Sequence, residues 1–106
     1  MITNFIIKWD DNINNNDFPR FQNELQQELT TQVAKMGARL VNWYNLSGFI
    51  TKDDKCLYFA YISNEIDITK TNCVIIRNAN NTTDYNSTNN QYMTLKQSLE
   101  KIIQML

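Results

Sequence analysis

Residues 39–63 read RLVNWYNLSGFITKDDKCLYFAYIS, and this stretch decides the fold. It is rich in β-branched and aromatic residues, which favour strands over helices. The polar segment Lys52-Asp53-Asp54-Lys55 divides it, and the two aspartates can accept hydrogen bonds from nearby backbone N–H groups in a tight turn. We therefore predict an antiparallel hairpin with strands at 39–51 and 56–63.

Pairing outward from this turn sets the register of the hairpin. It places Phe59 opposite Gly48 and Tyr58 opposite Phe49, so a large ring can cover a glycine that has no side chain. A glycine at this place can equally mark a bulge.

Two asparagines, Asn42 and Asn45, lie inside the predicted strand 39–51. Asparagine is a poor strand former. We therefore expect these side chains to find hydrogen-bond partners, water or a polar partner on one face of the hairpin.

Two amphipathic helices are predicted to cover the sheet. The first has Asp17 as its N-cap and Pro19 in its first turn, and it ends before Gly37. The second begins at a capping box formed by Thr94 and Gln97. In each helix the apolar residues recur every three or four positions, which places them on one stripe. These stripes are Phe18, Phe21, Leu25, Leu29, Val33 and Met36 in the first helix, and Leu95, Leu99, Ile102, Ile103 and Leu106 in the second.

The remaining segments complete a single α+β domain over residues 1–106. Segments 2–9 and 72–77 have the composition of strands, whereas 10–16 and 78–91 are rich in Asn and are predicted to be loops, the second of them long and mobile. The predicted order is β-α-β-β-β-α. We expect a two-layer sandwich, with an antiparallel sheet of about four strands and two helices on one face.

The composition argues against enzymatic chemistry. The chain has no His, which removes Ser–His and Cys–His nucleophile pairs and histidine-ligated metal sites. Two glycines cannot build a phosphate-binding loop, and the two cysteines, Cys56 and Cys73, cannot close a zinc site by themselves. We expect no catalytic residue, no cofactor and no bound metal, and the sequence leaves open whether the two thiols form a disulfide.

The charge balance and the hydropathy of the sequence argue against nucleic acid and membrane as partners. The chain has 10 basic and 11 acidic residues, whereas nucleic-acid binders usually show a basic excess. A nucleic-acid-binding α-β-β-β-α module is therefore the alternative and not the first hypothesis. Residues 1–5 lack the basic region followed by a long apolar region that a signal peptide has, so we expect none, and the longest apolar run, 57–62, is too short to span a membrane. We expect a cytoplasmic protein that does not contact a membrane.

The hairpin is the predicted protein-binding surface. Strand 56–63 is apolar on both sides, so both its faces are buried or one of them meets a partner. Aromatic rings with polar tips suit such a contact, and the polar face of the first helix could form its rim. The candidate binding residues are Trp43, Tyr44, Phe49, Tyr58 and Tyr61 from the hairpin, with Gln26 and Gln27 from the helix.

The composition also suggests a biological setting. The chain has 16 Asn and 12 Ile, a bias that AT-rich genomes produce. Small domains of this kind are common among phage and mobile-element accessory proteins. We therefore expect a non-enzymatic protein that inhibits a host nuclease or another defence complex in the host cytoplasm, as anti-CRISPR inhibitors do. A homodimer and a self-assembling structural subunit are the other protein-binding hypotheses.

Overall fold

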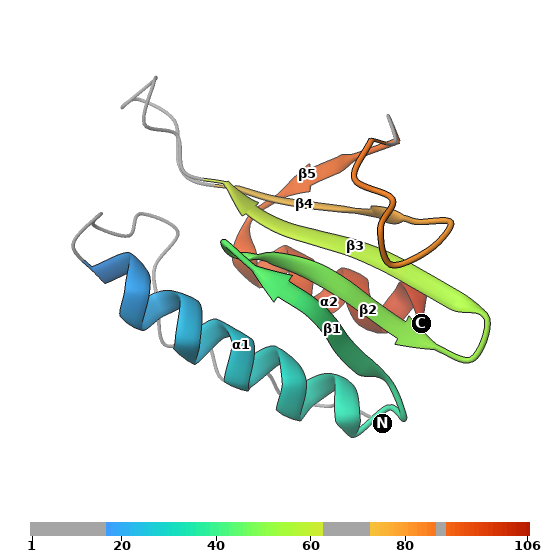
Figure 1. The fold of residues 1–106 in the computed structure, drawn as a ribbon, viewed down its shortest axis with the longest axis horizontal. Helices are drawn as coiled ribbons and strands as arrows, with labels where there is room; N and C mark the ends of the chain where they lie inside the picture. Colours follow the sequence, from blue (N-terminus) through green and yellow to red (C-terminus); the bar gives the residue numbers. More distant parts are fainter. Residues whose placement is uncertain (1–16, 63–72, 87–88) are drawn as a thin grey trace.

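The computed structural model describes residues 17–62, 73–86 and 89–106. Within these ranges the chain forms two helices and one five-stranded antiparallel sheet whose strands follow their order in the sequence (Figure 1). The fold is α+β as predicted, with five strands where about four were expected. The predicted strand 2–9 and loop 10–16 lie outside the described residues. The elements are α1 (Phe18–Ala34), β1 (Arg39–Tyr44), β2 (Ser47–Lys52), β3 (Lys55–Ile62), β4 (Cys73–Asn78), β5 (Gln91–Met93) and α2 (Leu95–Met105).

The prediction of one strand over 39–51 is wrong, because this segment forms two strands joined by a tight turn. Asn45 and Leu46 have φ values of +50° and +62°, as the two central residues of a type I′ hairpin turn require. Asn42 also has a positive φ, +56°, and lies where the register of β1 and β2 shifts at a bulge. The two asparagines therefore mark a bulge and a turn, because Asn tolerates the left-handed backbone better than most residues.

The predicted register of the second hairpin is confirmed. Phe59 lies opposite Gly48, and Tyr58 lies opposite Phe49. The ring of Trp43 covers Gly48 so closely that a Cβ atom added there would come within 3.1 Å of it. Glycine is needed at this position because the indole of the bulged neighbouring strand occupies the space of a side chain.

The two helices begin and end where the sequence predicts, within a residue or two. Gly37, with φ +76°, follows α1 and turns the chain towards β1. Asp17 stands at the N-cap without a capping side-chain bond, and its carboxylate lies 3.8 Å from the guanidinium of Arg20. The capping box of Thr94 and Gln97 at the start of α2 is confirmed.

Both helices pack on the same face of the sheet, as predicted. Their apolar stripes and the inward-facing side chains of β2, β3 and β4 form one continuous core. Among the described residues, no helix is long and apolar enough to cross a membrane. The buried core residues include Phe21, Leu25, Leu29 and Val33 of α1, Ile50, Leu57, Phe59, Tyr61, Val74 and Ile76 of the sheet, and Leu95, Leu99 and Ile102 of α2.

Candidate functional site

A loop of the chain covers one half of the sheet face that lies opposite the helices. Directly paired residues of neighbouring antiparallel strands point to the same face, so the strand register identifies the side chains that share a row. Residues 79–86, which we call the cover loop, lie across one such row and are drawn in orange in front of the sheet in Figure 1. The covered row consists of Val41, Phe49, Tyr58 and Arg77.

Arg77 connects the cover loop to the sheet. Only 1% of its surface is exposed, and its Nη1 atom lies 3.5 Å from a carboxylate oxygen of Asp84. Its Nη2 atom donates a hydrogen bond to the backbone carbonyl of Asp84, and its guanidinium lies 4.5 Å from the centre of the Tyr58 ring. A buried guanidinium requires charged and polar partners, and the loop supplies them.

Three further contacts hold the cover loop against the sheet. The Tyr85 ring packs edge-on against Phe49 and Tyr58, with ring centres 5.2 and 6.0 Å apart. At the far side of the loop, the Nδ2 of Asn42 donates a 3.0 Å hydrogen bond to the carbonyl of Thr82. The bulge in β1 thus orients an anchor for a loop 40 residues further along the chain.

The cover loop has internal structure of its own. The N–H of Thr83 donates to the side chain of Asn81, and the N–H of Asn80 donates to the carboxylate of Asp84, each over 2.9 Å. Asn and Asp favour such local turns because their short side chains can accept bonds from nearby backbone N–H groups. The predicted loop 78–91 is shorter than expected, since its first residue belongs to β4 and its last to β5. Its mobility stays a prediction.

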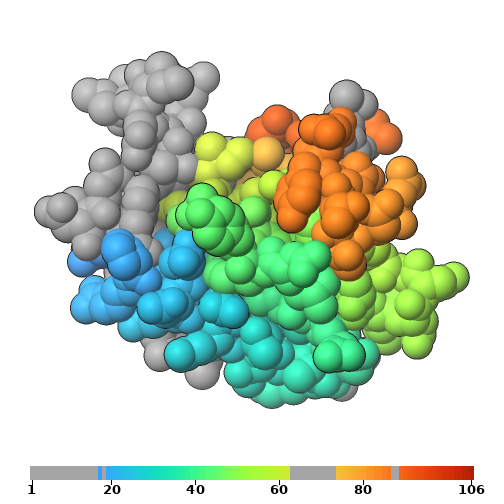
Figure 2. All heavy atoms as spheres, in the orientation of Figure 1, coloured from blue at the N-terminus to red at the C-terminus, as the bar shows by residue number. Residues whose placement is uncertain are grey.

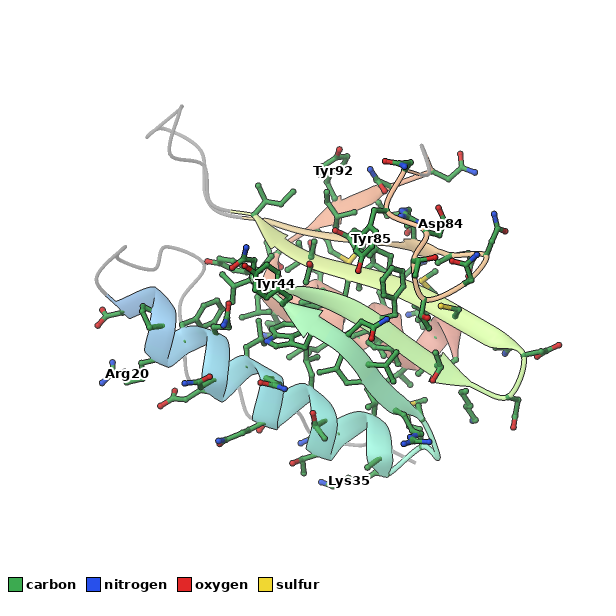
Figure 3. All side chains as sticks on the ribbon, in the orientation of Figure 1. Arg20, Lys35, Tyr44, Asp84, Tyr85 and Tyr92 are labelled. Atoms are coloured by element: carbon green, nitrogen blue, oxygen red, sulfur yellow. The ribbon has the colours of Figure 1, made fainter. Side chains whose placement is uncertain are left out.

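The neighbouring row on the same face is uncovered by the loop and is bordered by tyrosines. In the part of the chain that the structure describes, the exposed large hydrophobic side chains are Tyr44 (73% exposed), Tyr85 (52%) and Tyr92 (65%), and all three lie on this face (Figure 3). Figure 2 shows the orange cover loop and the green β1–β2 turn on the same side of the molecule. We call this surface the tyrosine face: Tyr44, Tyr85 and Tyr92 around a floor of Ser47, Ala60 and Ile75.

The tyrosine face is electrically neutral. The row from Tyr44 to Tyr92 contains no Lys, Arg, Asp or Glu. In the covered row beside it, Arg77 is buried and its charge is balanced by Asp84. Contacts on this surface therefore depend on aromatic packing and on neutral hydrogen bonds.

Two of the predicted binding aromatics point to the other side of the sheet. Tyr61 is buried against Phe21 of α1, with ring centres 4.7 Å apart. Trp43 is half-buried and packs against Phe59, with ring centres 6.0 Å apart. Both belong to the core between the sheet and the helices.

The other five predicted residues occupy three different places. Phe49 and Tyr58 lie beneath the cover loop, and Tyr44 is exposed on the tyrosine face. Gln26 and Gln27 are exposed on α1, which packs on the opposite side of the sheet. The structure does not bring the seven predicted residues together into one surface.

Sequence reasoning missed Tyr85 and Tyr92, which complete the tyrosine face. Tyr85 follows Asp84 and is the one aromatic residue in a stretch of Asn, Thr, Ser and Asp, so no repeating pattern marks it. Tyr92 lies in a strand of only three residues, too short for an alternating pattern to identify.

Cys56 lies beside the Arg77–Asp84 pair as a half-buried free thiol. Burial raises the pKa of this thiol, the nearby Arg77 opposes that increase, and the Asp84 carboxylate adds to it. The group is therefore a protonated thiol at neutral pH, unlike the thiolate that cysteine chemistry requires. Cys73 pairs with Ile62 at the other end of β3, roughly 20 Å along the strand, so the two cysteines do not form a disulfide.

One hollow of about 370 Å³ lies between the start of α1 and the β1–β2 turn. The described residues that line it are Pro19, Gln22, Asn45 and Leu46, none of which titrates. Across residues 17–62, 73–86 and 89–106, no group of three or more Cys, Asp or Glu side chains is placed to hold a metal ion.

Comparison with known proteins leaves the site to be interpreted from its own geometry. No protein-family model matches the chain, and comparisons with curated proteins and with solved structures give no match. The features that define the site are an aromatic row held under the cover loop and a neutral row bordered by exposed tyrosines.

Proposed function

We propose that this chain is a non-enzymatic protein-binding module and that the tyrosine face contacts the protein partner. One observation supports this most directly: among the described residues, the exposed large hydrophobic side chains are all tyrosines, and all lie on one face of the sheet. Tyr44 and Tyr92 lie on the two edge strands of the sheet and Tyr85 lies over strands between them, so the three rings single out this sheet face as the candidate interaction surface.

Tyrosine is well suited to such a surface. Its ring buries a large apolar area, its hydroxyl satisfies a hydrogen bond at the edge of the contact, and it loses little side-chain entropy on binding. Within the row, Ser47 and the buried Ala60 have much smaller side chains than Tyr44 and Tyr92, so a partner side chain can settle over Ser47 and Ala60.

The nucleic-acid alternative has less support on this surface. Aromatic platforms that stack bases usually lie beside cationic side chains that hold the phosphates. The row from Tyr44 to Tyr92 contains none, and the Arg77 guanidinium beside it is buried and paired. Retention on heparin or single-stranded RNA that falls steeply with salt would favour this alternative over the protein partner.

The partner class that the composition suggests is a host nuclease or another defence protein. This narrower role is part of the proposal and draws on the Asn and Ile excess of the sequence. The experiment that locates the contact also identifies the partner, because the captured protein can be sequenced by mass spectrometry.

Site-directed photocrosslinking in cells tests the proposal. A photoreactive phenylalanine analogue replaces Tyr92 or Tyr44, and a matched variant places it at Gln27 on the outer side of α1. We expect covalent protein adducts from positions 44 and 92 and none from position 27, since only the first two lie on the tyrosine face.

The opposite pattern would refute the proposal. Adducts from position 27 alone would assign the contact to the Gln-rich helix face. A chain that is folded by circular dichroism yet gives no protein adduct from either tyrosine position would exclude the tyrosine face as a protein-binding surface.

A further inference from the structure

We infer that the cover loop is an autoinhibitory segment: Asp84 and Tyr85 occupy a peptide-binding site on the covered row, and a partner segment with an acidic residue followed by an aromatic one takes their place when the loop opens. This inference goes beyond the proposed function, because it assigns a ligand to the covered row. It is based on the contacts of these two loop residues, on the exposure of the rest of the loop and on the buried charge of Arg77.

The charged part of the site is the guanidinium of Arg77, of which only 1% is exposed. Among the described residues, its polar partners outside β4 both belong to Asp84: the carboxylate lies 3.5 Å from Nη1, and the backbone carbonyl accepts a hydrogen bond from Nη2. The guanidinium thus presents separate donors to a carboxylate and to a peptide carbonyl, which its planar fork suits well. An acidic residue in an extended or turning peptide is therefore the ligand that this cation selects.

The aromatic part of the site lies directly beside the charged part. The rings of Phe49 and Tyr58 receive the edge of Tyr85, with ring centres 5.2 and 6.0 Å away. Tyr58 also lies under the guanidinium of Arg77, 4.5 Å from ring centre to charge, so the two parts of the site share a residue. Consecutive residues of the loop fill both parts, which sets the ligand pattern as an acidic residue followed at once by an aromatic one.

The rest of the cover loop is weakly held. None of the residues 79–86 is buried. Beyond the two inserted side chains, the N–H of Ala79 donates to the carbonyl of Cys56 over 2.8 Å, directly after β4. Further along, Asn42 donates one hydrogen bond to the carbonyl of Thr82. Segments with few buried apolar contacts open at a lower free energy than the core, so this loop can open while the sheet and helices stay folded.

The open state is one that a suitable ligand stabilises. Opening exposes the ring of Phe49, which is fully buried beneath the closed loop, and it leaves Arg77 without its carboxylate. A ligand that supplies a ring and a carboxylate offsets both costs. The tethered loop competes with that ligand at a roughly millimolar effective concentration. A free peptide with the same side chains therefore binds only the fraction of molecules whose loop is open.

A peptide titration of the full chain tests the inference. The probe is a capped peptide with the sequence of residues 80–86, and the variant Asp84→Ala, Tyr85→Ala removes the competing side chains from the loop. Backbone amide chemical shifts report both affinity and position. We expect the variant to bind the peptide at least about tenfold more tightly than the unmodified chain does, with shifts centred on Tyr58 and Arg77.

Matched controls separate recognition from a general loosening of the loop. Asn86→Ala changes an exposed residue of the same loop and should leave peptide affinity at the level of the unmodified chain. A peptide with Asp84→Asn should bind the double variant at least about tenfold more weakly, since it lacks the carboxylate that pairs with Arg77. A peptide with Tyr85→Ala should also bind more weakly.

The double variant leaves Arg77 without its carboxylate, so its fold is checked by circular dichroism. If it is unfolded, Tyr85→Ala alone takes its place, because this variant keeps the ion pair and still vacates the ring position. It should bind the peptide more tightly than the unmodified chain, by a smaller factor than the double variant. Equal affinity of this variant and the unmodified chain would then overturn the inference.

Three further results would overturn it. These are a folded double variant that binds no peptide at millimolar concentration, equal affinity of the double variant and the unmodified chain, and shifts that lie outside β2, β3 and β4. The proposed function fails separately. Photocrosslinked adducts from positions 44 and 92 without peptide binding would leave the proposed function standing and remove this inference, whereas peptide binding without such adducts would do the reverse.

Discussion

The two rows of side chains on the sheet face opposite the helices differ in whether the chain covers them. Each row adds apolar or aromatic side chains to a sheet face that the helices do not cover. Over the covered row, the chain places its own loop, and Phe49 becomes fully buried. No described residue of the chain lies across the neighbouring row, and Tyr44 and Tyr92 stay mostly exposed.

The two rows differ in the contacts that their side chains can make with a covering loop. The covered row ends in Arg77, whose charge stabilises a loop that brings a carboxylate, and Asn42 at its other end binds the loop backbone. The uncovered row has no charged or amide side chain for a loop to bind. Aromatic residues in the first row therefore contribute to the packing of the fold, whereas Tyr44 and Tyr92 in the second remain exposed.

The largest expected effect is on stability, and it should separate the two rows. Phe49→Ala removes a fully buried ring that contacts Tyr58 and Tyr85, and we expect a loss of about 4 kcal/mol in the free energy of unfolding. Tyr44→Ala removes an exposed ring and should cost less than about 0.5 kcal/mol. Urea denaturation followed by circular dichroism measures both values.

A milder variant keeps this comparison informative if Phe49→Ala does not fold. Phe49→Leu should cost about 1.5 kcal/mol, still well above Tyr44→Leu. Similar losses at positions 44 and 49 would contradict the division of the face into a row that stabilises the fold and an exposed row that does not.

The second expected effect concerns the pair that holds the cover loop. Arg77→Ala removes a buried guanidinium and leaves Asp84 without its partner, so we expect a loss of about 3 kcal/mol. Asp84→Asn keeps the shape and the backbone carbonyl contact, and should cost about 1.5 kcal/mol. Arg39→Ala, an exposed arginine in β1, is the matched control and should change stability by less than about 0.5 kcal/mol.

A double-mutant cycle determines whether Arg77 and Asp84 act as one unit. We expect a coupling of about 1 kcal/mol or more between the two substitutions, because each removes the same contact. Purely additive losses would show that the loop is held by its other contacts, those of Tyr85 and Asn42.

Local signals explain why part of this fold can be predicted from the sequence. The Lys52–Lys55 turn is short and polar, and the register of the strands beside it follows directly from its position. The capping box of Thr94 and Gln97 likewise depends only on residues three apart. These features need no knowledge of distant contacts.

The missed features depend on unusual backbone or on long-range contacts. The turn at Asn45 and Leu46 escaped prediction because leucine seldom adopts a φ of +62° and is not a turn signal. The cover loop packs on the sheet through Arg77 and through Asn42, and the latter contact spans 40 residues of sequence. The tyrosine face escaped prediction for the same reason, since its three rings come from two edge strands and a loop.

The smallest expected effect is on the reactivity of two thiols, one beside the Arg77–Asp84 pair and one on the tyrosine face. With Cys73→Ser to remove the other thiol, the alkylation rate of Cys56 should rise with a midpoint above pH 9.0, because burial and the Asp84 carboxylate raise its pKa. Asp84→Asn should move this midpoint to lower pH, since it removes one of the causes of the increase. The control variant carries Cys56→Ser, Cys73→Ser and Ser47→Cys and is measured at low protein concentration. Its single thiol lies on the uncovered row, and its titration midpoint should fall at a lower pH than that of Cys56. A Cys56 midpoint at or below pH 9.0 would show that burial beside the Arg77–Asp84 pair does not raise the pKa of this thiol.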